Sequence, residues 1–293
     1  MALGAEVDRN YRYLIGGLVV GRGTPWVVTT IEGLDLPDTV YDDEERPSDH
    51  GGWAGRPVLR PRTIVLELVA RSDDVDELED LRTTAGAELI PTEDVRPFVW
   101  KRPGRDPLLA WVQVRRVSSP IDPLGSWYEH PVTVELRAPD PRVYELRERT
   151  LTVGMRRVAG GFGFPLSFPL EFTDDLEGDE GDLGRAVAYN IGRFPTRPAI
   201  RLTGPFRSAT VENVTTGQAI RLLEGVPDDG FVDLDPDART VLLDGTADRR
   251  WWIDDRGDSH LELAPGPNEL RFVGDTYAPD ASMRVVWRSA WTL

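Results

Sequence analysis

The last hundred residues most constrain the fold, because short apolar runs there are separated by turn residues at regular intervals. Many short strands with evenly spaced turns are typical of a two-sheet β-sandwich, here of jelly-roll type. Glycine-containing turn pairs separate many of the runs: Thr216-Gly217, Asp229-Gly230, Asp244-Gly245 and Pro265-Gly266. The predicted strands are Ala199–Leu202, Thr210–Asn213, Ala219–Leu223, Gly230–Leu234, Thr240–Leu243, Arg250–Ile253, His260–Leu263, Asn268–Val273 and Met283–Trp291.

The first 150 residues predict a second, sandwich-like β domain with one helix. The helix is expected over Asp73–Ala85, with Ser72 as N-cap and Gly86 as C-cap. Four apolar residues at helical spacing predict one buried stripe: Val75, Leu78, Leu81 and Ala85. Strands are predicted at Tyr11–Val20, Pro25–Glu32, Thr63–Val69, Val95–Lys101, Leu108–Ser118 and Trp127–Arg137.

The chain of 293 residues is long enough for two domains, and it is rich in glycine and proline but poor in helical patterns. We therefore predict a mainly β protein with an N-terminal domain over 1–150, a connector over 151–195 and a C-terminal β-sandwich over 196–293. The connector is rich in Gly, Phe and Pro, and it contains the acidic run Asp174–Asp182, which is most simply a solvated loop.

A segment of unusual length, residues 38–62, lies between the predicted strands that end at Glu32 and begin at Thr63. Connections this long are usually functional or disordered. The segment is too charged to bury much of itself, but charge pairing and an aromatic anchor could order it against another copy of the chain. We interpret it as an assembly loop or hairpin, with a flexible surface loop as the alternative. Its candidate assembly residues are Asp42, Asp43, Glu44, Glu45, Trp53, Arg56, Arg60 and Arg62.

Composition excludes several classes of protein. There is no cysteine, so neither a disulfide framework nor a thiolate metal site is possible. A net charge of −16 disfavours nucleic-acid binding. The N-terminal apolar run Leu14–Val20 is too short to span a membrane, and no signal-peptide pattern precedes it. We expect a protein that is made in a cytoplasm and does not insert into a membrane.

One acidic segment imitates a calcium loop. Asp233-Leu-Asp-Pro-Asp237 has the one-three-five carboxylate spacing, and Asp244 occupies the twelfth place. However, Ala238 stands where the sharp turn needs glycine, and no helices flank the segment. A hairpin turn between two strands explains the pattern more simply, so we predict no metal and no cofactor.

No catalytic motif stands out. His50, His130 and His260 are scattered without zinc-ligand spacing. Ser48-Asp49-His50 contains the residue types of a catalytic triad, but sequential neighbours rarely form one. The abundant acidic pairs leave a glycosidase possible on composition, although each pair is most simply surface charge.

Tryptophan suggests a second kind of site. Trp251 and Trp252, with Trp287 and Trp291, could form a platform that stacks on sugars. Adjacent residues on a regular strand point to opposite faces, so at most one of Trp251 and Trp252 would face outward, and we favour core or interface packing. The segment Arg96–Arg105, with its aromatic residues, favours a subunit interface over nucleic-acid contact.

Pieces spread over nearly the whole chain resemble the distal tail (Dit) protein family of phages with long, non-contractile tails, often described as minor tail proteins in phages of actinobacteria. Their order and spacing carry the resemblance. The pieces are Gly33–Pro37, Arg62–Leu68, Arg115–Pro120, Leu136–Tyr144, Gly163–Pro169, Asn190–Gly192, Pro198–Pro205, Val211–Gly217, Pro265–Asn268 and Val286–Trp291.

The resemblance implies a hexameric ring at the tail tip in the virion. The N-terminal domain would form the ring, with a hairpin or loop that reaches the neighbouring subunit, and a galectin-like C-terminal sandwich would point outward. The ring would join the tail tube to the tape-measure and tail-associated hub proteins. Genomic DNA would pass through its channel without specific binding, which suits an acidic chain because phosphates gain nothing from acidic walls.

Three functional hypotheses follow. The first is a structural tail hub that assembles as a ring and has no enzymatic activity. The second is a carbohydrate-binding module that acts in adhesion to the host surface. The third, a carboxylate-based glycosidase, has the least support. A hub needs the loop in Ile31–Val69 and the strands in Leu108–Arg137 to bury surface between subunits, whereas a monomeric sugar-binding protein does not.

Overall fold

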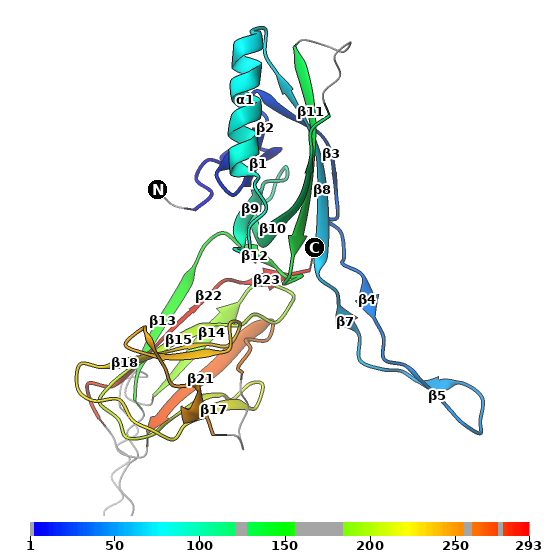
Figure 1. The fold of residues 1–293 in the computed structure, drawn as a ribbon. Coiled ribbons are helices and arrows are strands. Elements are labelled where there is room, and N and C mark those ends of the chain that lie inside the picture. The colour runs from blue at the N-terminus through cyan, green and yellow to red at the C-terminus, as the bar shows by residue number, and fades with distance from the viewer. Residues whose placement is uncertain (1–2, 121–127, 156–183, 255–259, 275–277, 293) are drawn as a thin grey trace, which may run out of the picture. The chain divides into compact units, whose positions relative to one another are not determined.

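The computed structural model describes residues 3–120, 128–155, 184–254, 260–274 and 278–292 (Figure 1). The chain divides into two compact units. Unit 1 comprises Met1–Leu146 and the last residues Trp291–Leu293, and unit 2 comprises Arg147–Ala290. Both are built from antiparallel strands, with one α-helix among the described residues, which confirms the predicted fold class.

Unit 1 contains a large antiparallel sheet with the strand order β2-β1-β9-β10-β11-β8-β3, and β12 and β23 extend it from β10. Three of the six neighbouring pairs in this order, β1-β9, β11-β8 and β8-β3, join strands that are not consecutive in sequence, so half of the pairs are long-range. Its strands are β1 Arg12–Ile15, β2 Leu18–Gly21, β3 Trp26–Glu32, β8 Arg62–Arg71, β9 Arg96–Trp100, β10 Leu108–Ser118, β11 Glu129–Ala138, β12 Val143–Glu145 and β23 Ala290–Trp291.

The burial pattern of β8 explains its place inside the sheet, between β11 and β3. Ile64, Leu66, Leu68 and Ala70 alternate with more exposed residues and are fully or almost fully buried. Along all ten residues of the strand, β8 pairs with β11, whose buried residues follow the same alternation. Two half-buried strands in matching register place one apolar face on the core.

Helix α1, Val75–Glu88, packs against β8 and β11 and buries Leu78 and Ala85, as predicted. Its ends differ from the prediction. Asp74, not Ser72, is the N-cap, and its carboxylate accepts from the Asp76 N–H at 2.9 Å. The helix also passes through Gly86 and ends at Glu88, because the buried Leu89 continues the apolar stripe as C-cap. Val75, predicted to be buried, is exposed.

The predicted strand Tyr11–Val20 is instead a hairpin of β1 and β2. The chain reverses at Gly16-Gly17, and Gly16 has a φ of +61°, a conformation that glycine adopts without steric cost. Four predicted strands correspond closely to β3, β8, β9 and β10. The strand predicted to begin at Trp127 is β11, and the start of that prediction lies outside the described residues.

Unit 2 is a sandwich of two antiparallel sheets around one core. One sheet has the order β13-β22-β15-β18-β19-β20, and the other has β14-β21-β16-β17. Both contribute buried residues to a single apolar cluster, for example Leu202 and Val285 from the first and Val211 and Phe272 from the second. The strands are β13 Arg149–Gly154, β14 Arg185–Asn190, β15 Ala199–Thr203, β16 Ala209–Asn213, β17 Gln218–Leu222, β18 Phe231–Asp235, β19 Thr240–Leu243, β20 Ala247–Asp248, β21 Gly266–Gly274 and β22 Ser282–Trp287.

Three of the predicted C-terminal strands need correction. Arg250–Ile253 is a 3-10 helix, η2, over Arg250–Trp252. His260–Leu263 forms no strand; only Leu263 makes an isolated bridge, to Thr196. Met283–Trp291 is interrupted between β22 and β23.

The described ends of the predicted connector 151–195 belong to unit 2, where β13 pairs with β22 and β14 pairs with β21. Residues 156–183, with the acidic run and the piece Gly163–Pro169, lie outside the described residues. The predicted domain boundaries therefore stay a prediction. None of the described helices is long and apolar enough to cross a membrane.

Candidate functional site

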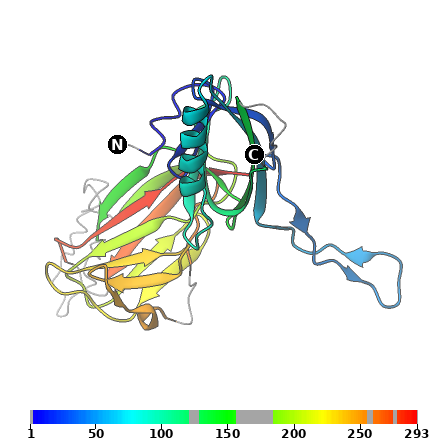
Figure 2. The same ribbon diagram turned by 45° about the horizontal axis from the view of Figure 1, so that its top comes forward.

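The predicted assembly segment is a two-stranded hairpin, which we call the arm (residues 38–60). It leaves unit 1 between β3 and β8 and extends away from the sheet (Figures 1 and 2). Near its base β4, Thr39–Val40, pairs with β7, Val58–Leu59. Farther out β5, Glu44–Glu45, pairs with β6, Gly52–Trp53.

Hydrogen bonds outside these short strands complete the arm. The Arg60 N–H donates to the Asp38 carbonyl at 2.8 Å, and the Arg46 N–H donates to the Gly51 carbonyl at 3.2 Å. Between the two pairs of strands, the Asp43 carboxylate accepts from the Gly55 N–H at 2.8 Å. The segment is thus a paired hairpin and not an unstructured loop.

Arg62 anchors the base of the arm from inside unit 1. Only 2% of its surface is exposed, and its guanidinium donates to four backbone carbonyls. These carbonyls belong to Gly33 (2.9 Å), Asp35, Pro141 (3.2 Å) and Thr292 (2.6 Å). Burial lowers the pKa of Arg62, and the charge of Asp35 opposes this in part. The side chain holds together backbone from distant parts of unit 1.

Gly33, which precedes the arm, has to be a glycine because of its backbone conformation and its close packing. Gly33 has a φ of +83°, and a Cβ there would lie 1.9 Å from the Thr63 carbonyl oxygen. Only glycine fits where the chain turns out of β3 towards the arm.

The arm surface combines acidic and apolar side chains. Asp42, Asp43, Glu44 and Glu45 are exposed. Trp53 is 53% exposed, and the guanidinium of Arg46 lies over its ring at 5.5 Å while also approaching Asp49 at 3.6 Å. Large apolar residues are exposed as well: Leu36 just before the arm, and Val40, Tyr41 and Val58 on it. The arm therefore exposes several large apolar side chains to water in addition to its charged groups.

The structure therefore separates the predicted assembly residues into two groups. Asp42, Asp43, Glu44, Glu45, Trp53, Arg56 and Arg60 lie exposed on the arm. Arg62 is buried, and both of its terminal amino groups donate to carbonyls of unit 1, so it lies beneath the base of the arm and not on the exposed surface of the arm. Sequence reasoning missed the exposed apolar side chains of Val40, Tyr41 and Val58. They could have been found from the β-forming residues that lie on both sides of the acidic run.

Two tryptophans of the possible sugar platform, Trp251 and Trp252, both lie in η2, but they differ in exposure. Trp251 is 67% exposed, whereas Trp252 is 6% exposed and belongs to the core of unit 2. Their rings meet edge to face at 6.0 Å. Trp287 is also in this core and donates to the Tyr189 carbonyl at 3.3 Å. Of these two neighbouring residues only Trp251 is exposed, in agreement with the expectation that at most one of them faces outward.

The acidic segment that imitates a calcium loop is a hairpin turn between β18 and β19. Its carboxylates have protein partners. Asp233 pairs with Arg201 through two bonds of 2.6 and 2.8 Å, and Asp237 accepts from Arg197 at 2.9 Å. Asp235 accepts from two N–H groups of its own turn. No group of metal-ligating side chains occurs among the described residues.

The other motifs resolve as structural features. Asp49 and His50 lie at the exposed end of the arm, where the Asp49 carboxylate accepts from the His50 backbone N–H. In the segment 96–105, Phe98 and Trp100 are buried in unit 1 and stack on each other at 5.2 Å. These aromatic residues contribute to the core and not to an interface, which corrects that part of the prediction.

Comparisons with known proteins agree with this architecture. Residues 191–291 match the family described as siphovirus-type tail component, C-terminal domain. No curated protein sequence matches the chain.

Several solved structures resemble nearly the whole chain. One is the crystal structure of the Dit protein (gp 19.1) of phage SPP1, described as a paradigm of hub adsorption apparatus in phages that infect Gram-positive bacteria. It is 13% identical, with a TM-score of 0.63 over 95% of this chain and 98% of the other. The second is from the phage P2 baseplate in its activated conformation with calcium, at 12% identity and a TM-score of 0.52 over 94% of this chain and 97% of the other. The fold is Dit-like.

Proposed function

We propose that this chain is a distal tail hub component of a phage tail, where it has a structural and not an enzymatic role. The observation that carries the proposal is the Dit-like fold along almost the full length of both chains, together with the match of the C-terminal third to a tail-component family. This role places the protein at the tail tip of the virion.

We further propose that six copies form a ring through unit 1, with the arm of each copy binding the next. Two features support this: the exposed apolar side chains of the arm, Trp53 among them, and the anchor that Arg62 provides at its base in unit 1. A hairpin of this kind has no core of its own, so binding a neighbour would bury the apolar groups that it exposes to water.

The ring would join the tail tube to the tape-measure and tail-associated hub proteins and surround the path of the genome. The net charge of −16 supports passage of DNA without adhesion. We propose an origin in a phage of actinobacteria; Lys101 is the only lysine among 34 basic residues, a bias associated with GC-rich genomes.

The test is the mass of the purified protein by light scattering after size exclusion, with negative-stain images of the peak. We expect a closed ring with a central hole. In the variant Trp53→Ala, each interface should weaken by about 1–2 kcal/mol, so the ring should dissociate at higher protein concentrations than wild type.

Trp251→Ala is the matched control, because it removes another exposed indole, from unit 2. Equal assembly of wild type, Trp53→Ala and Trp251→Ala would contradict the role of Trp53. A wild type that stays monomeric at all concentrations, alone and with tail-tube protein, would contradict the ring.

The alternative is a carbohydrate-binding module acting in host-surface adhesion. Its support is the exposed Trp251, since aromatic side chains with one open face are suited to apolar contacts. Because Trp252 is buried, the two-tryptophan platform is not available for sugar stacking. The alternative predicts that Trp251→Ala abolishes adhesion to host cell walls while assembly is unchanged, the reverse of the result expected for Trp53→Ala.

A further inference from the structure

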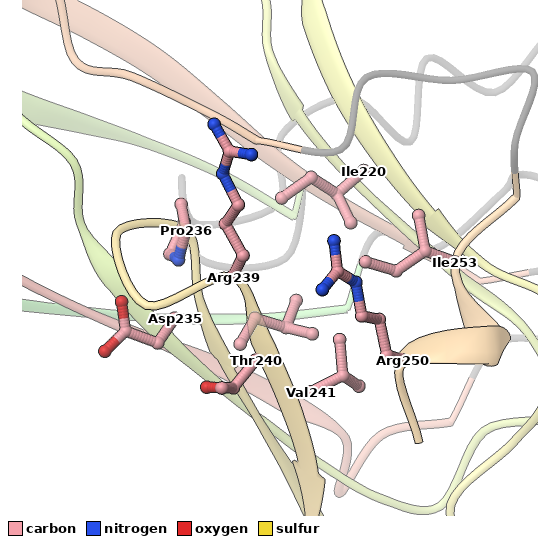
Figure 3. A pocket seen from close by; sticks show the side chains of 9 residues that line it. Ile220, Asp235, Pro236, Arg239, Thr240, Val241, Arg250 and Ile253 are labelled. Carbon is pink, nitrogen blue, oxygen red and sulfur yellow. The ribbon is translucent and has the colours of Figure 1, made fainter. Parts of the chain in front are cut away.

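A small pocket in unit 2 lies between the β18–β19 turn and η2 (Figure 3). Its volume of about 50 Å³ is enough for roughly three or four water molecules, or for one small polar group. Apolar side chains form part of the lining, and two arginines complete it. The lining residues are Ile220, Leu234, Asp235, Pro236, Arg239, Thr240, Val241, Arg250 and Ile253.

Arg239 is placed by the turn after β18. The Asp235 carboxylate accepts from the N–H groups of Asp237 and Ala238, both at 2.9 Å, and this holds the turn. Arg239 itself has a φ of +56°, in the left-handed region that L side chains rarely adopt. Glycine or asparagine is the usual residue in such a position, so a charged side chain here is a departure that points to a use.

Arg250 comes to the same pocket from a different element. It opens η2, and its backbone N–H donates to the Asp248 carboxylate at 2.9 Å. The guanidiniums of Arg239 and Arg250 both extend to the side of the pocket where Ile220 and Ile253 lie (Figure 3).

Neither guanidinium has a hydrogen-bond or ion-pair partner among the described residues. This contrasts with Arg197 and Arg201 of the same unit, which are paired with carboxylates. Asp235 is the one acid in the lining, and its carboxylate is engaged by the N–H groups of its own turn. The pocket therefore offers two cationic forks beside an apolar surface, without a carboxylate between them.

We propose that this pocket binds a small organic oxyanion, a phosphate or carboxylate group carried on a short polyol or sugar. The planar guanidinium fork matches both groups and can bind them with two parallel N–H···O bonds. The carbon part of the ligand packs on Ile220 and Ile253, which reduce the access of water and strengthen the charged hydrogen bonds. This inference does not depend on the proposed tail function.

The experiment uses the full chain and follows the arginine Nε–Hε signals by NMR during titration. The probes are glycerol 1-phosphate and glucuronate, with glycerol as the neutral control. We expect saturable shifts with an oxyanion probe and none with glycerol. Arg239→Gln and Arg250→Gln should each weaken binding by about ten-fold or more, because each removes a charged hydrogen-bond donor. The probe that binds more tightly identifies phosphate or carboxylate as the natural group.

Arg284→Gln is the matched control, since this exposed arginine on β22 does not line the pocket. Unchanged affinity in Arg284→Gln, with loss in both pocket variants, supports the site. The proposal is overturned if neither probe gives a saturable shift, if glycerol binds equally well, or if Arg284→Gln weakens binding as much as the pocket variants do.

Discussion

Among single residues, Arg62 has the widest structural influence, because one side chain satisfies carbonyls from four separate positions in unit 1. In Arg62→Met the carbonyls would remain buried without donors. We expect the free energy of unfolding to fall by about 2–4 kcal/mol in urea denaturation.

The control for this change is Arg56→Met on the exposed surface of the arm. It removes the same charge and should change stability by less than about 0.5 kcal/mol. If both variants lost the same small amount, the carbonyl cluster would not depend on Arg62.

His130 predicts a pH dependence of stability. It is buried on β11, and its Nε2 shares a hydrogen bond with the Ser119 hydroxyl. Burial lowers the pKa of His130, the positive charge of Arg82 lowers it further, and Glu79 opposes the shift. The folded protein therefore keeps the imidazole neutral at a pH where the unfolded chain already binds a proton.

The direction of the pH dependence of stability follows from this difference between the pKa of His130 in the folded and in the unfolded chain. The stability contribution is complete above the ordinary histidine pKa of about 6.5, and it is lost as the pH falls from there towards the folded-state pKa. We expect urea denaturation to show a decline of at most about 1.4 kcal/mol per pH unit in that window. The decline should be smaller in His130→Gln and unchanged in His50→Gln, which alters the exposed end of the arm. An identical slope in all three proteins would contradict the role of His130.

At the scale of elements, helix α1 shows what local sequence can and cannot predict. Its existence and the burial of Leu78 and Ala85 follow from apolar spacing, but the same spacing also included Val75, which is exposed. The start of the helix does not follow from local sequence, because Ser72, Asp73 and Asp74 are all good N-cap residues. Tertiary structure decides which of the three residues is the N-cap. The Ser72 N–H donates to the Tyr128 carbonyl next to β11, which holds Ser72 outside the helix, so that the helix begins after Asp74.

We expect Asp74→Ala to lower the free energy of unfolding by about 1 kcal/mol, because the Asp76 N–H loses its acceptor. Asp73→Ala is the control, with an expected change below about 0.5 kcal/mol. Urea denaturation measures both, and hydrogen exchange in the first turn of α1 should rise only in Asp74→Ala. A larger effect at Asp73 would show that the helix begins one residue earlier.

For the arm, the sequence predicted the position of the element but not its internal structure. The sequence identified the segment from its length and charge, but its pairing was hidden, because the strands are two residues long and the Asp43 side chain bridges the gap between them. Arg62 was grouped with the exposed arginines for a related reason: charge in sequence gives no indication of burial, and an arginine is rarely buried without a carboxylate.

At the scale of the whole molecule, the chain has two sets of buried residues with no member in common among the described residues. The cores of unit 1 are formed by residues between Leu3 and Leu146, and that of unit 2 by residues between Leu151 and Trp287. The sequence anticipated two β domains with one helix, because short apolar runs and turns are local signals. It did not reveal that the last residues return to unit 1, since such a contact joins distant positions.

Separate cores predict separate responses to mutation. Leu66 on β8 and Leu234 on β18 are both buried, and replacing either with alanine should cost about 2–5 kcal/mol. Hydrogen exchange measured by mass spectrometry should show loss of protection in β8 and β11 for Leu66→Ala, and in β15 and β18 for Leu234→Ala. Because each core is bounded by its own sheets, the other unit should keep its wild-type exchange in each case. Loss of protection in both units from either single change would mean that the two cores unfold as one cooperative body.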